Sequence, residues 1–522
     1  MTRFGKTRAQ RARARGGESS PAAPPFRLEA ASHKDAPFSG EIMDLNIEAV
    51  APGGRALAHA PDGRVVFVDL GVPGQKVRAE IIRSKGGYLE ARRREVLCPA
   101  AEQEAPFCPY FGICGGCIWQ EMPYARQLET KRAHILESLA RLGGVRGEAL
   151  EELTAPVLPS PEQRHFRGKV ELAFGPGPER PSGGKKGALS GAAAPLLGFR
   201  HLGGHAVVDI AACPIADARL PELLDAVRSW AGESKLRAYT PATGGPAGNQ
   251  AGVQPRDISE VLRFLVVRTS RLSGRAAVEL ITAPALQAAR RVRDLGETLL
   301  ARLPWVESFT HSLRRADSDI AYGEEIVLSL GAPYLKEGMG GLSYELSPAS
   351  FFQTNPAAAQ ALVGEAVRLL APQARETIWD LYAGVGAFSL PLAARGARVT
   401  GLEANPAAVA DARRNAEANS LENCLFVAGD VRALLCKPPA AVQARPDAVL
   451  ADPPRAGLHP DVSAALVRLR PGRILLVSCH LATLARDLGV LSKAYELRAV
   501  QGVDMFPYSA HVETLCLLTL RG

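Results

Sequence analysis

Apolar and polar residues follow two different periods along the chain, and the changes of period predict where strands and helices lie. From residue 351 onward, short apolar runs alternate with stretches of helical period. We predict strands in this region at Thr377–Leu381, Arg398–Glu403, Cys424–Ala428, Asp447–Ala451, Arg473–Ser478 and Leu515–Leu520. Strands that alternate with helices are typical of a parallel, doubly wound sheet, so the expected fold class is α/β.

A smaller β-rich unit is predicted at residues 38–97. The run Arg64–Leu70 is rich in β-branched residues, the Gly/Pro segment 71–74 interrupts it, and Gln75–Ile82 alternates in part. Short strands at this spacing are typical of a small barrel. The basic residues between 76 and 94 are compatible with an RNA-facing side and equally with a solvated surface.

The middle of the chain gives a weaker pattern. A helix is predicted at Tyr124–Leu142, and strand-like runs lie at Lys169–Phe174, Val261–Thr269 and Ala276–Thr282. Stretches rich in Gly, Ala and Pro near 175–195 and 240–255 lack periodicity, so we expect loops or flexible insertions there. We therefore divide the chain into a disordered basic tail (1–36), a barrel (37–97), a central α+β domain (98–350) and a C-terminal α/β domain (351–522).

The composition is that of a globular protein. The chain has 522 residues, of which 47% are hydrophobic and 22% are charged. This is enough apolar material for several buried cores, and it excludes a mainly disordered chain. No run of about 18 apolar residues predicts a membrane span, and the N-terminus lacks the apolar stretch of a secretory signal. We expect a cytoplasmic protein with no membrane partner.

The charge balance points to an anionic partner. The net charge is +8, and residues 1–20 carry six basic residues against one acidic residue. Nucleic acid is the commonest partner of such a chain. The tail itself is compatible with an arm that touches phosphate, with a solvated segment of no specific role, and less well with a transit peptide.

Three carboxylate or glycine signals suggest a nucleotide-type cofactor site. The loop Asp380–Phe388 follows a predicted strand and carries Gly384-x-Gly386, which permits close approach of a ligand to the backbone. Glu403 ends the second strand, where a carboxylate can accept both hydroxyls of a ribose, and Asp430 follows the third. The set is typical of an S-adenosylmethionine site. A nicotinamide site fits less well, because the third glycine of the dinucleotide motif is missing.

Candidate catalytic groups follow the later strands. Asp452-Pro453-Pro454-Arg455 comes after the fourth strand, and Arg455 stands where amino-group methyltransferases carry an aromatic residue. Cys479 follows the fifth strand and is a candidate nucleophile, the alternative being a small buried apolar residue. Glu513 precedes the last strand and is a candidate general base, the alternative being a polar residue on an exposed loop.

The cysteines suggest a metal or cluster site. The chain has nine cysteines, an odd number, and four of them lie within residues 98–117. An odd number in a chain without a secretory signal argues against a disulfide framework. Cys108, Cys114 and Cys117 have the spacing C-x5-C-x2-C.

Five motifs in this order resemble the bacterial RNA 5-methyluridine methyltransferases, in particular their iron–sulfur-containing 23S ribosomal RNA branch. The resemblance covers residues 38–522. The motifs are Phe351–Asn355, Asp380–Phe388, Asp452–Arg455, Ser478-Cys479 and Asp504–Glu513. The resemblance implies a C-terminal Rossmann-like class I methyltransferase domain, an N-terminal TRAM barrel that binds RNA, a central domain that carries a cluster, and a monomer.

The resemblance also implies residue roles. Cys479 would add to C6 of uracil, C5 would take the methyl group of S-adenosylmethionine, and Glu513 would remove the C5 proton. Phe506 and Phe352 are candidates for stacking on the flipped base. The implied cofactor residues are Gln353, Tyr382, Glu403, Asp430 and Asp452, and the implied ligands of a [4Fe–4S] cluster are Cys108, Cys114, Cys117 and Cys213. Four thiolates also suit zinc, so spacing leaves both metals open.

Two positions depart from the family pattern, and alternatives remain. His480-Leu481 replaces Asn-Pro after the nucleophile, and Ala387 replaces an Asn of the glycine loop. The first alternative is a transfer RNA enzyme acting at the same atom; the four-cysteine pattern favours the ribosomal branch. A cytosine-5 enzyme fits less well because no Pro-Cys motif ends the fourth strand. The alternative outside enzymes is a catalytically inactive iron–sulfur protein that binds RNA or assists assembly.

Overall fold

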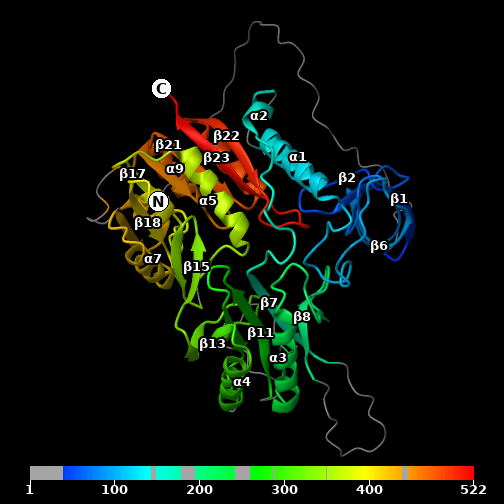
Figure 1. Ribbon diagram of the computed structural model, residues 1–522. Helices are drawn as coiled ribbons and strands as arrows, with labels where there is room; N and C mark the ends of the chain where they lie inside the picture. The colour runs from blue at the N-terminus through cyan, green and yellow to red at the C-terminus, as the bar shows by residue number, and fades with distance from the viewer. Residues whose placement is uncertain are drawn as a thin grey trace, which may run out of the picture.

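The computed structural model describes residues 39–142, 148–177, 194–240, 259–285, 288–348, 350–437, 442 and 445–522. The tail expected to be disordered (1–36) and most of the two Gly/Ala/Pro-rich stretches lie outside these residues. A small β unit, a central α+β unit and a C-terminal α/β unit surround a common centre (Figure 1). Within the part of the chain that is described, no helix is long and apolar enough to cross a membrane.

The N-terminal unit is a six-stranded, mainly antiparallel β structure with strand order β1-β5-β6-β4-β3-β2. Alternate residues such as Val66, Ala79 and Ile81 are fully buried and form its own core. Both strands predicted here are present, and the long β6 that follows them was not predicted. The strands are β1 (Ile42–Asn46), β2 (Ala49–Val50), β3 (Ala56–His59), β4 (Val65–Val68), β5 (Lys76–Lys85) and β6 (Tyr88–Cys98).

The central unit is an eight-stranded mixed sheet covered on one face by two helices. Its order is β14-β13-β12-β11-β7-β8-β9, and β10 pairs with β11. Leucines and valines of α3, α4 and the sheet form one core. The strands are β7 (Lys169–Gly175), β8 (Leu196–Arg200), β9 (Val207–Asp209), β10 (Arg237–Ala238), β11 (Glu260–Thr269), β12 (Ala276–Thr282), β13 (Val306–Leu313) and β14 (Glu325–Gly331). The helices are α3 (Leu220–Ser234) and α4 (Ala288–Arg302).

The C-terminal unit is built on a seven-stranded sheet with the order β19-β18-β17-β20-β21-β23-β22. The first five strands are parallel, but β23 is antiparallel to both β21 and β22. The prediction of a wholly parallel sheet is therefore wrong at this edge, where β22 was also missed. The strands are β17 (Thr377–Leu381), β18 (Arg398–Glu403), β19 (Cys424–Ala428), β20 (Ala448–Ala451), β21 (Arg473–Ser478), β22 (Tyr495–Val503) and β23 (Glu513–Leu520).

Helices cover both faces of this sheet, because successive strand residues point to opposite faces. Ile378 and Leu475 pack in one core, whereas their neighbours Trp379 and Leu476 pack in the other. The first core contains α5 (Pro356–Leu370), α6 (Ser389–Ala393) and α7 (Pro406–Ala418), and the second contains α8 (Val431–Cys436), α9 (Pro460–Leu469) and α10 (Leu481–Leu491). A hairpin of β15 (Leu335–Met339) and β16 (Leu342–Leu346) leads into α5.

Helix α1 (Tyr124–Leu142) packs on the C-terminal sheet beside α10, although its sequence position is in the central region. Its residues Ile135 and Leu139 are fully buried in the second core of that sheet. After α2 (Glu148–Leu153), isolated bridges join Thr154 to Val500 and Leu158 to Val503 of β22. In Figure 1, α1 runs from the small β unit toward the C-terminal sheet, so it ties these two units together.

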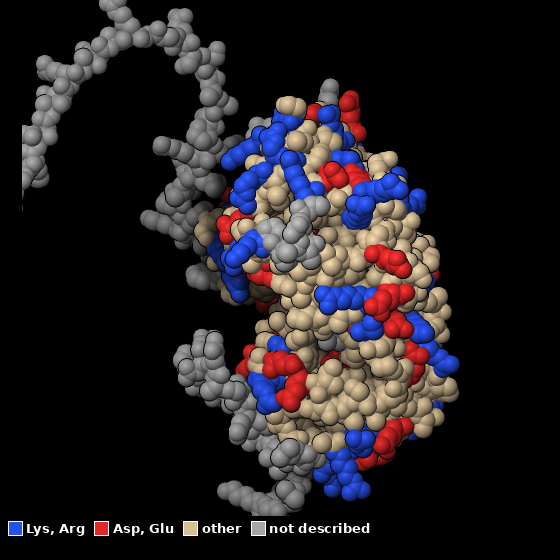
Figure 2. All heavy atoms as spheres, turned by 90° about the vertical axis from the view of Figure 1, so that its left-hand side faces the viewer, with Lys and Arg blue, Asp and Glu red and all other residues tan. Residues whose placement is uncertain are grey.

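The face in Figure 2 shows basic and acidic side chains interspersed, with a hollow at mid-height between the C-terminal unit above and the central unit below. Basic side chains are most numerous over the upper part. Neither sign of charge therefore dominates this whole face.

Two glycines of the C-terminal unit are expected to respond in opposite ways to alanine. In β18, a Cβ at Gly401 would lie 2.5 Å from Phe426 and 3.0 Å from the Cβ of Ala383, so Gly401→Ala should destabilise the fold by about 1–3 kcal/mol. A Cβ at Gly364 in α5 meets nothing within 4 Å, so Gly364→Ala should stabilise by about 0.5–1 kcal/mol. Urea unfolding of both variants measures the contrast; equal effects would contradict it.

Candidate active site

The carboxyl ends of the parallel strands meet at one edge of the C-terminal sheet, and the predicted residues gather there. Tyr382 follows β17, Glu403 ends β18, Asp452 follows β20 and Cys479 follows β21. In open α/β sheets this edge is where ligands bind.

The glycine loop after β17 has left-handed backbone conformations and open space beside Gly384. Tyr382, Gly384 and Gly386 have φ values of 66°, 55° and 89°, which is the left-handed region. A Cβ at Gly384 would meet nothing within 4 Å. The Glu403 carboxylate accepts hydrogen bonds from the Gly384 N–H (3.0 Å) and the Asn405 N–H (2.7 Å). Each carboxylate oxygen keeps a lone pair for a further donor, so the pair of hydroxyls of a ribose fits this carboxylate.

Tyr382 and Asp430 lie near one another at the far side of this loop. Burial raises the pKa of Tyr382 to about 12, and the negative charges of Asp430 and Asp487 contribute. Asp430 is exposed, and its side chain accepts from the Ala433 N–H at the start of α8. An exposed carboxylate beside a half-buried aromatic ring is suited to an amino group at the end of a ligand.

Gln353 lies in the segment that precedes α5 and is half-buried. The segment is fixed from two sides, since Gly168 N–H donates to the Thr354 carbonyl (2.7 Å) and the Asn355 amide donates to the Met505 carbonyl (3.1 Å). Asn355 also caps α5 by accepting from the Ala358 N–H. The contacts place Gln353 beside the loop that leads to Glu513. Among the described residues, no hydrogen bond joins Gln353 to the glycine loop.

The β21–β23 pairing brings Cys479 and Glu513 together. Ser478 at the end of β21 is paired with Thr514 of β23, so the next positions, Cys479 and Glu513, face each other across the two strands. Glu513 is 7% exposed, and Cys479 is partly exposed. The charge of Glu513 raises the pKa of Cys479 after the larger effect of burial, which is consistent with this proximity.

Asp452 and Arg455 complete the group. The charge of Glu513 adds to burial in raising the pKa of Asp452 well above its usual range. Burial raises the pKa of Glu513 to about 7, and the Arg455 guanidinium opposes that rise. Arg455 also lowers the pKa of Cys479 through its charge and a hydrogen bond. One guanidinium thus stabilises both the thiolate and the carboxylate.

Cys479 precedes a capped helix, α10. The His480 ring accepts from the Thr483 N–H, so His480 is the N-cap of α10. The His480 N–H donates to the Ser478 hydroxyl at 3.1 Å, and Thr483 Oγ1 donates to the Arg455 carbonyl at 3.1 Å. Histidine therefore supplies the capping acceptor, and the positive end of the α10 dipole favours the thiolate of Cys479.

Two residues of the site were missed as functional candidates. Arg455 was noted only as a departure from an aromatic position, and its charge was the available signal. Asp380 is fully buried behind the glycine loop, where its Oδ2 accepts from Ser389 Oγ at 2.5 Å. Its Oδ1 has no hydrogen-bond partner among the described residues, and burial raises its pKa to about 7. No sequence pattern indicates that one oxygen of a buried carboxyl lacks a hydrogen-bond partner.

The four predicted cysteine ligands line one cavity. Cys108, Cys114 and Cys117 lie on the loop between β6 and α1, and Cys213 comes from the segment after β9. A bridge between Cys114 and His201, and a hydrogen bond from Gly115 N–H to the Arg200 carbonyl (3.0 Å), join the cysteine loop to the end of β8. The other lining residues are mainly apolar: Tyr110, Phe111, Phe199, Ile210, Ala212 and Ile215, with Gly116, Gln120 and Arg167.

Burial strongly affects three of the four thiols that line the cavity. Burial raises the pKa of Cys117 to about 12 and also raises those of Cys114 and Cys213. Backbone N–H groups of Gly116 and Ile215 donate to the sulfurs of Cys114 and Cys213, respectively. Among the described residues, no three His, Cys, Asp or Glu side chains are arranged to hold one metal ion.

The cysteine cavity also contacts the loop before Glu513. The Ile118 and Trp119 N–H groups donate to the Tyr508 carbonyl at 2.9 and 3.1 Å. Tyr508 packs with Phe107, Cys117 and Cys213 in a small apolar cluster. The chain thus links the thiol-lined cavity to the hairpin that carries Glu513.

Models of known families match three parts of the chain. Residues 443–521 match tRNA (Uracil-5-)-methyltransferase, residues 358–450 match the TRM5/TYW2 methyltransferase domain, and residues 38–93 match the TRAM domain. The last match falls on the N-terminal β unit, and the first contains Cys479 and Glu513.

Whole-chain relatives agree with these matches. An uncharacterised RNA methyltransferase of Nitratidesulfovibrio vulgaris is 39% identical over 92% of this chain and 96% of its own length. One from Thermosynechococcus vestitus is 33% identical over 92% and 98%. Among solved structures, the tRNA (uracil-54, C5)-methyltransferase of Pyrococcus abyssi, in complex with S-adenosyl-L-homocysteine, is 27% identical with a TM-score of 0.68 and covers 91% of this chain and 100% of its own.

The raised pKa of Glu513 gives a prediction about stability. A glutamate in an unfolded chain has a pKa of about 4.3, whereas the pKa of Glu513 in the fold is about 7. The folded protein therefore gains stability as pH falls from 8 toward 5. Glu513→Gln removes this titrating group. The free energy of unfolding of the variant minus that of wild type should therefore be larger at pH 8 than at pH 6, by roughly 1 kcal/mol.

Urea unfolding at the two pH values, without added cofactor, measures this difference. Glu417→Gln on the exposed side of α7 is the matched control. A difference between Glu513→Gln and wild type that stays constant with pH would contradict the burial of this carboxyl.

Proposed function

The chain belongs to the family of RNA (uracil-5-)-methyltransferases, and on that premise we propose that it forms 5-methyluridine in 23S ribosomal RNA. The methyl donor is S-adenosylmethionine. The observation that supports the proposed chemistry best is the placement of Cys479 opposite Glu513, with Asp452 and Arg455 beside them, at the edge that also carries the glycine loop.

The proposed reaction uses Cys479 to make uracil nucleophilic. C5 of uracil attacks a sulfonium methyl group poorly, but a thiolate added to C6 leaves an enolate with its electron pair available at C5. C5 takes the methyl group of S-adenosylmethionine, which leaves as S-adenosylhomocysteine. Glu513 then removes the C5 proton, the C6–S bond breaks, and Cys479 leaves as thiolate. The thiolate and the neutral uracil ring are both restored.

Arg455 and Asp452 have roles that follow from their charges. Arg455 stabilises the thiolate of Cys479 before attack and again when it leaves. Asp452, whose pKa is raised, is suited to donate or accept a hydrogen bond at the uracil or at the reacting end of the cofactor. The charges of Asp452 and Glu513 act on each other, which disfavours the state in which both carboxyls are ionised.

The remaining cofactor contacts follow the crevice. Glu403 would hold the ribose hydroxyls, Tyr382 and Asp430 would hold the adenine end, and Gln353 would lie near the end that carries methyl. Ala387 packs partly against the first core and offers no polar contact there.

The cysteine cavity supports a [4Fe–4S] cluster held by Cys108, Cys114, Cys117 and Cys213. Around a single zinc, four sulfurs at about 2.3 Å from the metal stand within about 4 Å of one another. No single-ion grouping exists among the described residues, yet four thiols surround one cavity with N–H groups donating to two of them. N–H groups that donate to ligand sulfurs are also a feature of iron–sulfur clusters, and the chemistry of a cluster here would be structural or redox.

The ribosomal substrate rests on the four-cysteine pattern, and a transfer RNA substrate is the second candidate. The matching family model and the Pyrococcus abyssi structure are both named for transfer RNA enzymes. The TRAM unit supports an RNA partner in either case.

A methyl-transfer assay tests the proposed reaction and its substrate together. Anaerobically purified protein is incubated with labelled S-adenosylmethionine and, separately, unmodified 23S RNA and transfer RNA. We expect labelled 5-methyluridine in 23S RNA with wild type, a loss of at least about 10³-fold for Cys479→Ala, and an RNA–protein adduct that accumulates with Glu513→Gln because the proton cannot leave.

Each other outcome has a distinct meaning. Label in transfer RNA alone would overturn the ribosomal substrate and keep the chemistry. Full activity of Cys479→Ala would overturn the nucleophile. If folded wild type binds RNA but labels neither pool and forms no adduct with 5-fluorouridine RNA, the chain is a binding protein rather than an enzyme acting on these RNAs.

Metal analysis tests the cluster. We expect iron and acid-labile sulfide in wild type, loss of most of both in Cys117→Ser, and no loss in the control Cys98→Ser, whose residue is exposed and lies outside the cavity. Zinc without sulfide, or iron content that is equal in Cys117→Ser and wild type, would contradict the proposal.

A further inference from the structure

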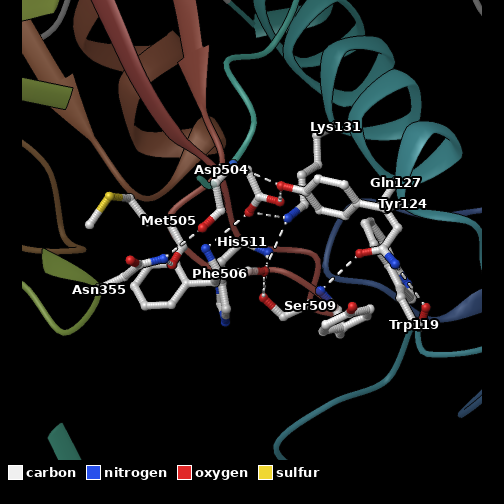
Figure 3. Close-up of polar contacts among 12 residues, drawn as sticks. Trp119, Tyr124, Gln127, Lys131, Asn355, Asp504, Met505, Phe506, Ser509 and His511 are labelled. Atoms are coloured by element: carbon white, nitrogen blue, oxygen red, sulfur yellow. Dashed lines mark hydrogen bonds and ion pairs between the residues drawn. The ribbon is translucent and has the colours of Figure 1, made fainter. Parts of the chain in front are cut away.

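The loop of residues 504–512 joins β22 to β23 at the active edge of the sheet. Val503 and Glu513 are the paired residues that flank the loop, so a movement of the loop would change the position of Glu513. Figure 3 shows Lys131 and Tyr124 reaching from α1 to Asp504, while Phe506 and His511 point away from α1. None of these α1 side chains has a part in the reaction described above.

A fully buried ion pair holds the start of this loop. The side chains of Lys131 and Asp504 are both 0% exposed, and Lys131 Nζ lies 2.6 Å from Asp504 Oδ1. The Tyr124 hydroxyl donates to Asp504 Oδ2 at 2.9 Å and accepts from the Ser160 N–H at 2.8 Å. Every oxygen of the carboxylate therefore has a donor supplied by α1 (Figure 3).

Lys131 and Asp504 also form hydrogen bonds with the backbone of one loop residue, Phe506. The Phe506 N–H donates to Asp504 Oδ1 at 2.9 Å, and Lys131 Nζ donates to the Phe506 carbonyl at 3.1 Å. Ser509 Oγ donates to that carbonyl as well, at 2.9 Å. Both backbone polar groups of Phe506 are thus fixed, which sets the direction in which its side chain leaves the chain.

Phe506 contacts His511, a residue on which the charges of Arg455 and His480 act. The Phe506 ring makes an edge contact with His511, at 5.9 Å between ring centres. His511 is close enough to Arg455 and His480 for their charges to act on it. A shift at Asp504 is therefore transmitted through Phe506 and His511 to the neighbours of Cys479, and along the hairpin to Glu513.

A buried ion pair is a poor way to gain stability, because desolvation of two charges offsets most of their attraction. Apolar side chains of similar volume would fill the same space between α1 and the loop. The ion pair differs from an apolar contact because its hydrogen bonds are directional. A carboxylate and an ammonium therefore fix the orientation of the groups they join, and an apolar contact does not.

We propose that Lys131, Asp504 and Tyr124 are positioning residues for the methyl transfer, which hold the 504–512 loop so that Phe506 faces the flipped uracil and Glu513 faces its C5 proton. The proposal rests on the proposed roles of Cys479 and Glu513. Because the loop leads directly into Glu513 at the start of β23, whereas Cys479 follows a different strand, loosening the loop should slow proton removal more than thiolate attack.

The test compares Lys131→Met, Asp504→Asn, Tyr124→Phe and the double variant Lys131→Met/Asp504→Leu, which replaces the pair by apolar groups. The control is Arg473→Met, which breaks the 2.6 Å contact with Glu376 at the opposite end of β21. For each folded protein we measure thermal stability, S-adenosylmethionine affinity, kcat and KM for RNA, and the fraction of RNA trapped as methylated adduct.

We expect cofactor affinity within about twofold of wild type, kcat lowered by at least about tenfold in the Lys131 and Asp504 variants and about threefold in Tyr124→Phe, and more trapped methylated adduct. The double variant should recover thermal stability without recovering kcat. Arg473→Met should lose stability without a change in kcat or adduct.

Two results would overturn the proposal. If the double variant recovers both stability and kcat, the pair serves folding alone. If kcat is unchanged in all variants and only KM rises, the loop contributes to RNA binding and not to positioning of the base. Failure of the proposed function itself is separate, since wild type would then show neither turnover nor a Cys479-dependent adduct in the same assay.

Discussion

The antiparallel pairing of β23 with β21 is the constraint on which the active site depends. Five parallel strands deliver the glycine loop, Glu403, Asp452 and Cys479 to one edge of the sheet, since the carboxyl ends of parallel strands coincide. A sixth parallel strand in the same place would have presented only its own carboxyl end to that edge. Running in the opposite direction, β23 presents its amino end instead, and this puts Glu513 across from Cys479.

The cost of this arrangement is electrostatic. Glu513, Asp452 and Asp380 are carboxyls whose pKa values are raised by burial, and Arg455 is the cation whose charge reaches Glu513 and Cys479. Burial destabilises their charged forms, yet a base that titrates near neutral pH is better matched to proton transfer than an ordinary glutamate. Burial therefore lowers stability at neutral pH and gives Glu513 a pKa of about 7, which is the property that the proposed general base needs.

The active edge is assembled from all parts of the chain. Helix α1 packs on the C-terminal sheet, the thiol-lined cavity contacts Tyr508, and the central unit holds the segment before α5 through Gly168. The 504–512 loop is the point where these contacts meet. A change in the cysteine cavity or in α1 therefore has a direct structural route to Glu513, through hydrogen bonds and not through a long relay.

The sequence by itself determined most elements and the identity of the candidate groups. Apolar periods located β17, β18, β19 and β21 at their observed bounds, and the motifs named Cys479, Glu513 and the glycine loop, because local patterns specify local structure. It could not give the direction of β23, since a strand buried on both faces reads the same in either direction. Nor could it pair Lys131 with Asp504, which lie 373 residues apart. Tertiary packing decides both features. The strand direction and the ion-pair partner depend on how the whole sheet edge is buried, and local sequence preferences do not determine them.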